Sequence, residues 1–372
     1  MANFLLIATF EAVFIGLLIL AKRKKSTSDY ILFSLFVVYA ITIGFSFLEI
    51  YNRNNSYPYP IFISVSVPFI FLHGPLLWYY VLSLTKQKFT FRINHLFHLL
   101  PFLSMEIMFW FTSYRLPVVD RIAMDSGATF QQEVFYPVLL ILIALSTLVY
   151  YSLGLRRIQC HSAKIKSYFA EIGAINLKWI KMFLILALIC HLSISVLYIV
   201  DYSLGLMAYN SLQLSGFVMA SIYTLVLGFF GFRQGNIFTS GIIEVNLDTV
   251  ASTRKTEPLT TVEEQFVERF LAYMQNEKPF LNNELTLALL AKGLDVSPEY
   301  LSSVLNGRLN SNFFDFINRY RVEEFKRICH LPENKQYTII ALAYDCGFNS
   351  KATFNRVFRQ HTGTTPGAYI KK

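Results

Sequence analysis

Charged residues are scarce in this chain. Of its 372 residues only 15% are Asp, Glu, Lys or Arg, whereas 54% are hydrophobic. Soluble globular domains carry about 25% charged residues, so the composition argues against a protein that is soluble throughout. Most of the hydrophobic excess lies before residue 233. This distribution predicts a membrane domain followed by a more polar domain.

Cysteines are also few, and their spacing matches no metal or redox motif. The four cysteines form no C-x-x-C pair, and none lies beside a histidine at the spacing of zinc ligands; they are Cys160, Cys190, Cys329 and Cys346. We therefore expect no metal site, and we interpret the cysteines as free thiols or small buried side chains.

Signatures of catalysis are missing from the polar C-terminal part. It contains no glycine-rich phosphate loop, no G-x-S-x-G and no H-E-x-x-H. The sequence therefore predicts a protein that is not an enzyme and that holds no cofactor. An enzyme within the membrane part remains an alternative, with Glu11, Glu106 and the histidines as its evident acids and bases.

Hydrophobic runs of membrane-crossing length follow one another along the first part. The run 3–21 is followed at once by Lys22, Arg23, Lys24 and Lys25. A cleaved signal peptide carries its positive charge before the apolar run, so we expect an uncleaved membrane helix here. Further runs lie at about 30–50, 60–85, 95–113, 135–155, 180–200 and 211–232. The prediction is a seven-helix membrane domain, residues 1–232.

The charges of the connecting loops predict an orientation. Loops 22–29, 86–94 and 156–179 contain 12 Lys and Arg in total, whereas loops 51–59, 114–134 and 201–210 contain 3. Cytoplasmic loops carry the excess of positive charge. We therefore expect a multi-pass protein of the bacterial inner membrane, with its N-terminus outside and residues 233–372 in the cytoplasm.

Four ionisable residues interrupt the hydrophobic runs: Glu11, His73, Glu106 and His191. Because a charge in the bilayer is costly, such groups usually face the interior of a helix bundle or a water-filled cavity. We predict that they contribute to an intramembrane polar site. Hydrogen bonding between helices, ligand or proton sensing, and a metal site are the alternatives for its role.

Residues 233–260 form a predicted linker, and residues 261–372 form a second domain, here called the reader domain. In it, 337–366 reads as two short helices joined by Gly347, with Thr338 and Ser350 as N-caps. The second helix has an apolar face with a basic and amide face opposite; the apolar face is Phe354, Val357, Phe358 and His361. This pattern is typical of a DNA-binding helix-turn-helix, although an ordinary helical hairpin with a solvated basic face has the same pattern.

A second copy of the pattern lies upstream, at 285–307. Thr286 is its first cap, Ser297 and Pro298 begin its second helix, and 313–328 is a plausible helix connecting the two copies. Here the chain closely resembles the AraC/XylS-type transcription regulators over about 280–369. The likeness rests on L-T-x-x-x-L-A, V-S-P-x-Y-L-S, R-V-E-E and the run G-F-N-S…F-N-R-V-F…T-G-x-T-P.

The resemblance implies which residues contact DNA. By motif they are Glu299, Ser302 and Ser303 in the first recognition helix and Lys351, Asn355 and Arg356 in the second, with Arg359 suited to phosphates. Asp295 and Asn310 depart from the family because they stand where glycine is common, and Phe325 replaces a usual alanine in the connecting helix. Asp tolerates the left-handed conformation, so we expect the turn at Asp295 to survive.

These observations predict an all-α protein in which a seven-helix membrane domain precedes a tandem helix-turn-helix domain. The expected function is a membrane-bound one-component transcription regulator. Its partners would be double-stranded DNA, the lipid bilayer, an unknown signal ligand and a second copy in a homodimer. The alternative is a membrane receptor or transporter-like protein whose helical tail binds another protein.

Overall fold

The computed structural model describes residues 2–86, 89–126, 135–173, 175–205, 209–233 and 261–370. The chain forms two compact units: Met1–Gln159 with Leu177–Ser240, and Cys160–Asn176 with Gly241–Lys372. The predicted linker lies, from residue 234 on, outside the described residues.

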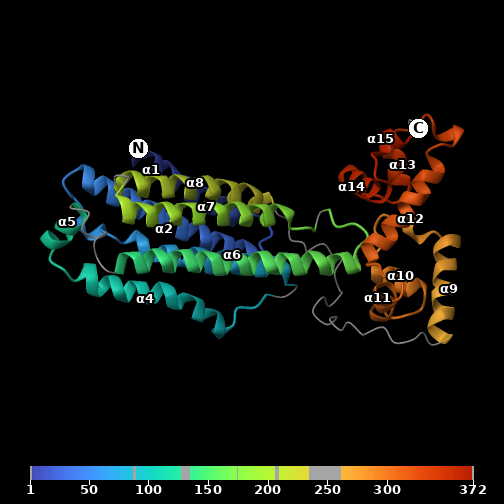
Figure 1. Cartoon of the computed structure of the whole chain (residues 1–372), viewed down its shortest axis with the longest axis horizontal. Helices are drawn as coiled ribbons and strands as arrows, with labels where there is room; N and C mark the ends of the chain where they lie inside the picture. The colour runs from blue at the N-terminus through green and yellow to red at the C-terminus, as the bar shows by residue number, and fades with distance from the viewer. Residues whose placement is uncertain are drawn as a thin grey trace. The chain divides into compact units, whose positions relative to one another are not determined.

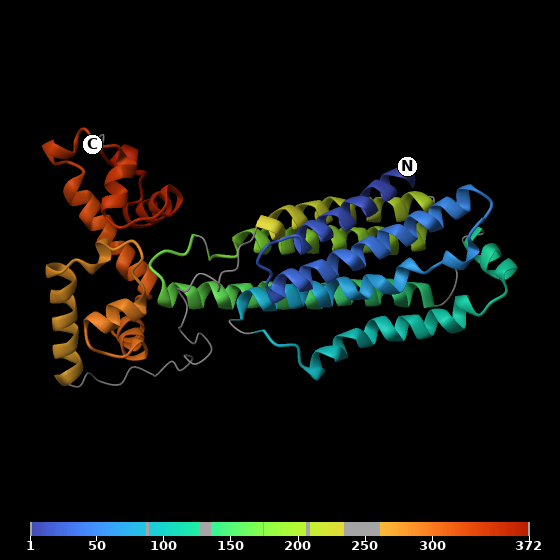
Figure 2. The ribbon, with the colours of Figure 1, turned by 180° about the vertical axis from the view of Figure 1, so that it is seen from behind.

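Helices, most of them long and apolar, build the first unit. They are α1 (Ala2–Leu20), α2 (Thr27–Asn54), α3 (Ser66–Thr85), α4 (Leu100–Phe109), α5 (Val118–Ser126), α6 (Phe135–Tyr168), α7 (Lys178–Leu204) and α8 (Tyr209–Arg233). The end of α6, from Cys160 on, belongs to the second unit. Short turns of 3₁₀-helix, Pro60–Phe62 and Ile93–Leu99, precede α3 and α4, and a π-helical turn, Trp110–Tyr114, extends α4. Figures 1 and 2 show α1, α2, α6, α7 and α8 running alongside one another.

In the part of the chain that the structure describes, six helices are long and apolar enough to cross a membrane. They are Thr27–Asn54, Ser66–Thr85, Ile93–Tyr114, Phe135–Tyr168, Lys178–Leu204 and Leu214–Phe232. The prediction of seven spans is therefore wrong in number. The first run forms a shorter apolar helix, Phe4–Leu20. This helix lies at the short end of the range of about 17–25 residues that crosses a bilayer.

Helices α1 and α2 pack against each other in opposite directions. Leu5 and Ala8 of α1 share a buried cluster with Ile43 and Ile50 of α2. A Cβ atom placed on Gly16, near the other end of α1, would lie 3.5 Å from the ring of Phe33, near the start of α2. The N-terminal end of each helix therefore lies beside the C-terminal end of the other.

The reader part of the second unit is also helical. It comprises α9 (Thr261–Asn276), α10 (Leu287–Gly293), α11 (Pro298–Gly307), α12 (Phe313–Ile328), α13 (Ile339–Asp345), α14 (Lys351–Thr362) and α15 (Pro366–Ile370), with 3₁₀ turns at Pro279–Leu281 and Pro332–Asn334. Figure 1 shows α12 between the pair α10–α11 and the pair α13–α14. The connecting helix predicted at 313–328 is confirmed, and the described residues contain no strand, only one isolated β-bridge.

Local signals in the sequence account for the helix ends. The Oγ atoms of Thr286, Ser297, Thr338 and Ser350 each accept a hydrogen bond from the backbone N–H three residues later, so all four predicted caps are confirmed. The predicted left-handed turn at Asp295 is also confirmed, with φ of 57°.

One predicted inward position is wrong. His361 is exposed, whereas Phe354, Val357 and Phe358 of the same apolar face are buried. His361 lies in the last turn of α14, just before the left-handed residue Gly363 that ends the helix. The apolar spacing in the sequence therefore continues for one helical turn beyond the last buried position of α14.

Candidate nucleic-acid interface

Helix α14 presents a basic and amide surface on the side away from its buried face. Lys351, Asn355, Arg356 and Arg359 are all exposed. Phe354 and Phe358 on the opposite side are fully buried against Phe325 of α12, with ring centroids 4.8 and 5.5 Å away. The packing fixes the rotation of α14, so the four predicted side chains share one exposed surface.

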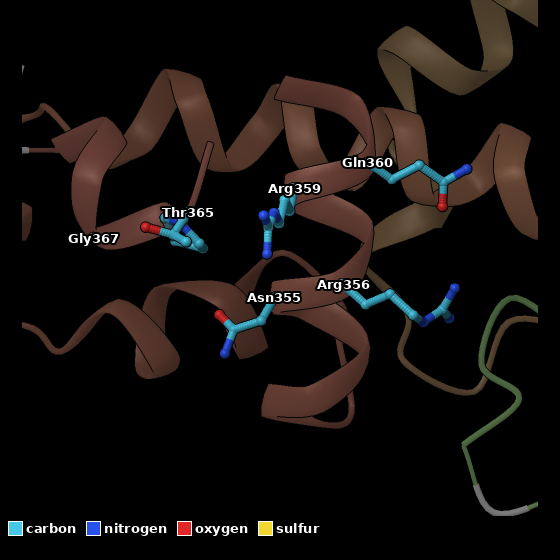
Figure 3. A pocket seen from close by; sticks show the side chains of 7 residues that line it. Asn355, Arg356, Arg359, Gln360, Thr365 and Gly367 are labelled. Carbon is cyan, nitrogen blue, oxygen red and sulfur yellow. The ribbon is translucent and has the colours of Figure 1, made fainter. Parts of the chain in front are cut away.

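These side chains leave α14 in different directions. Asn355 and Arg359 line an open groove with Thr365 and Gly367 at the start of α15 (Figure 3). Arg356 also lines this groove, but its side chain extends away from Asn355 in Figure 3, and its guanidinium carbon lies 5.3 Å from the ring centroid of Phe314 in α12. Its stacking with Phe314 holds the guanidinium close to α12.

Gln360 also lines this groove and was not among the predicted contacts. A signal was available, because Gln360 is exposed one residue after Arg359 on a helix whose inward positions are already taken by Val357 and Phe358. Its side-chain amide can donate and accept, which suits the edge of adenine.

The first recognition helix, α11, presents fewer accessible side chains for contacts with DNA. Glu299 and Ser303 are exposed, but Ser302 is only 5% exposed and its Oγ lies 3.3 Å from Asn306 Nδ2. Ser302 follows the buried Leu301 directly and precedes Leu305 by one helical turn, so it lies on the inner edge of the helix. The hydroxyl of Ser303 donates to the carbonyl of Tyr300, at 2.7 Å.

A buried arginine holds the two helix-turn-helix units to one framework. Arg321 of α12 is 0% exposed, and its guanidinium donates to the carbonyls of Phe280 and Asn282, each at 2.8 Å. Burial lowers the pKa of Arg321 to about 10, so the side chain stays charged at neutral pH. The second helix-turn-helix is joined to the same segment, because Asn349 Nδ2 donates to the carbonyl of Asn283 at 3.0 Å.

In the membrane part, the structure brings together two of the four predicted polar residues. His73 of α3 and His191 of α7 line one cavity of about 160 Å³, together with residues of α6 and α8. His73 Nε2 lies 3.0 Å from Thr42 Oγ1, and His191 Nδ1 donates to the carbonyl of Ala187 at 2.9 Å. Glu11 and Glu106 do not line this cavity.

A further polar cluster, missed by the sequence analysis, joins α2 to α5. Arg53 and Asp125 form two hydrogen bonds of 2.8 and 2.7 Å, and Tyr57 donates to the same carboxylate at 2.9 Å. Both charged side chains are only 8% exposed. No local pattern relates residues so far apart in sequence, so nothing in the sequence pointed to this pair.

Residues 290–372 match the family model of a helix-turn-helix domain. The match includes α11–α15 and supports an AraC-type helix-turn-helix regulator that binds double-stranded DNA. The membrane helices lie outside the matched residues.

A solved structure of a protein of unknown function from Listeria innocua is 27% identical to the chain. The alignment covers 28% of this chain and 94% of that chain, with a TM-score of 0.25. The TM-score is too low to indicate a shared fold over the whole chain. No curated protein matches the chain.

Proposed function

We propose that this protein is a membrane-bound one-component transcription regulator that reads DNA with α11 and α14. The observation that carries the proposal is the exposed face of α14, where Asn355, Arg356 and Arg359 project from a helix capped and packed as a recognition helix. Arginine pairs with guanine and asparagine with adenine in the major groove. Of the residues predicted in α11, Glu299 and Ser303 are accessible for base contacts.

Arg356→Ala is expected to weaken binding to a preferred sequence by about 1–3 kcal/mol and to relax the preference at one base pair. Arg359→Ala is the matched control on the same helix. If Arg359 contacts only phosphate, its loss weakens binding to all sequences alike and lowers the salt slope by about one. Gel shifts of the detergent-solubilised full chain at several salt concentrations measure both effects. Unchanged sequence preference in Arg356→Ala would show that Arg356 does not read a base.

We also propose that the protein lies in the bacterial inner membrane, with the reader domain in the cytoplasm. The bias of 12 basic residues against 3 between alternate loops supports this orientation, and the antiparallel packing of α1 on α2 supports an N-terminus on the opposite side from Lys22–Lys25. Cys160 is exposed and lies in α6, within the segment 156–179 expected inside. It should resist a membrane-impermeant maleimide in intact cells, and ready labelling would reverse the orientation.

The cavity between His73 and His191 is our candidate for the site of the signal. Its lining is mostly apolar, with the hydroxyl-bearing side chains of Ser66, Tyr136, Ser195 and Tyr198 beside the two histidines. Engineered apolar cavities of about 150 Å³ bind benzene, so the size suits a small aromatic molecule with a single polar group. Pairing of two chains stays a prediction, which the mass of the detergent-solubilised protein tests.

Filling this cavity should abolish ligand binding. A Cβ atom on Gly216 would lie 3.8 Å from Ile194, an ordinary contact, so Gly216→Ala should be tolerated and Gly216→Leu should occupy the space. Benzyl alcohol is expected to raise the melting temperature of the wild type by about 2–4 °C, the change that about 1 kcal/mol produces. The rise should shrink in Gly216→Ala and vanish in Gly216→Leu. Equal rises in all three proteins would exclude this cavity.

A further inference from the structure

A short loop from the first half of the sequence packs against the reader domain. Residues 169–173, here called the strap, lie between α6 and α7 in the sequence but belong to the second compact unit. Phe169, Ala170 and Ile172 are 5%, 0% and 6% exposed. Loops normally run over the surface with accessible side chains, so these values indicate a docked segment.

The strap bonds to both the first helix-turn-helix unit and the connecting helix. Phe169 forms an antiparallel β-bridge with Thr286, the N-cap of α10. The carbonyl of Ala170 accepts a hydrogen bond of 2.9 Å from Nδ2 of Asn318 in α12, a side chain that is 0% exposed. A buried amide bonded to a distant backbone carbonyl fixes the register of the contact.

The strap also reaches the second recognition helix. Glu171 Oε1 accepts hydrogen bonds from Thr353 Oγ1 at 2.9 Å and from the N–H of Gly173 at 2.6 Å. Thr353 is in the first turn of α14, and its own N–H is bonded to the cap, Ser350. The first residues of a recognition helix are those that enter the major groove. A carboxylate is therefore bound at the end of the helix that DNA must approach.

The carboxylate of Glu171 has the same sign of charge as a DNA phosphate. The positive end of a helix dipole attracts carboxylates and phosphates alike. The carboxylate also acts favourably on the charge of Arg321. Yet its other oxygen, Oε2, is buried without a hydrogen-bond partner among the described residues. A buried polar atom left unbonded is costly, so the docked strap is held less tightly than a fully bonded segment.

We propose that the strap is an autoinhibitory segment whose docking competes with DNA for the first turn of α14. This inference rests on the proposed function and adds its regulation. Because the strap is joined directly to α6 and α7, a signal that moves these helices would change the fraction of docked strap. The coupling is reciprocal: if docking of the strap weakens DNA binding by some factor, bound DNA weakens docking of the strap by the same factor.

A charge placed in the strap tests the competition. Ala170→Glu puts a carboxylate where no space or solvent is present, so the strap should undock. Its added negative charge would by itself repel DNA, so tighter binding can come only from undocking. Ala163→Glu, the same change at an exposed position of α6, is the control. The probe is a duplex enriched from a random-sequence pool by the full chain, or by Ala170→Glu, in detergent micelles.

The expected result is that Ala170→Glu binds this duplex at least about tenfold more tightly than the wild type, since apparent affinity scales with the fraction of competent protein. Ala163→Glu should show no gain. Binding by Ala170→Glu that is unchanged or weaker would overturn the proposal. In that case the strap would only pack against the reader or would hold it in its binding conformation.

A reversible lock gives a second test within one protein. Residues opposite each other in an antiparallel pair have Cα atoms about 4.5–5.5 Å apart, within the range of a disulfide. Phe169→Cys with Thr286→Cys, in a Cys160→Ser background, should cross-link on oxidation. The oxidised protein should lose most of its affinity for the duplex and recover it on reduction, and bound duplex should slow the cross-linking. Equal affinity before and after reduction would overturn the proposal.

The two proposals fail in different ways. If neither the wild type nor Ala170→Glu enriches any duplex, the proposed DNA binding is wrong. If both bind the same duplex equally and the disulfide changes nothing, DNA binding stands and autoinhibition by the strap is wrong.

Discussion

Replacing Gly347 by alanine is expected to destabilise the reader domain by about 2–5 kcal/mol, the combined cost of a left-handed residue and of overpacking. Gly347 has φ of 89°, and a Cβ atom there would collide with the carbonyl oxygen of Phe280 and lie 2.9 Å from that of Leu281. Both obstacles are backbone atoms. They cannot rotate away as a side chain would.

Gly363→Ala separates strain from collision. Gly363 also has a left-handed φ, 75°, but a Cβ atom there would have no atom within 4 Å. Its replacement should therefore cost only the backbone strain, about 1–2 kcal/mol. Hydrogen exchange of the full chain, read from peptides of α12 to α14, measures both variants. Equal losses of protection would mean that the close approach to Phe280 contributes nothing.

Arg321→Met is also expected to cause a large loss of stability in the reader domain. Methionine fills a similar space but leaves the carbonyls of Phe280 and Asn282 buried without their donors. Hydrogen bonds to charged groups contribute about 1.5–3 kcal/mol each, so a loss of about 3 kcal/mol or more is expected. The same turn that Gly347 packs against would lose its anchor, and DNA binding should fall with stability.

Arg319→Met is the control for Arg321. Arg319 belongs to the same helix, but it is exposed and its guanidinium carbon lies 5.5 Å from the ring centroid of Phe316. An exposed cation–π contact contributes about 0.5–1 kcal/mol, so this variant should stay near wild-type stability. Thermal unfolding of the reader domain compares the stability of the two variants. A loss of stability in Arg319→Met as large as that in Arg321→Met would show that the loss is not specific to the buried site.

The elements that the sequence predicted well have causes that are local. Caps such as Thr338 and Ser350 bond to backbone three residues away, and the apolar spacing of 313–328 is itself the buried face of α12. The match at 290–372 adds that the residues of α14 belong to a helix-turn-helix domain. Neither inference needs a contact between distant segments.

The features that the sequence analysis missed depend on distant segments. The carbonyls bound by Arg321 lie 41 and 39 residues away, and Arg53 is 72 residues from Asp125. Position within a helix also mattered. Ser302 followed the family motif, yet its place beside Leu301 turned it inward. The apolar run 3–21 is continuous in sequence, but the apolar helix that it forms is the shorter Phe4–Leu20. The base contacts themselves stay predictions.

The 182 residues between Glu171 and Thr353 also set an order of biosynthesis. Ribosomes add about 5–20 residues per second, so on the order of 10–40 s pass before the strap has a helix to bind. During that interval Phe169, Ala170 and Ile172 are exposed to water, chaperones and proteases. Every newly made chain therefore exists first with its strap undocked, and restraint of the reader is among the last events of its maturation.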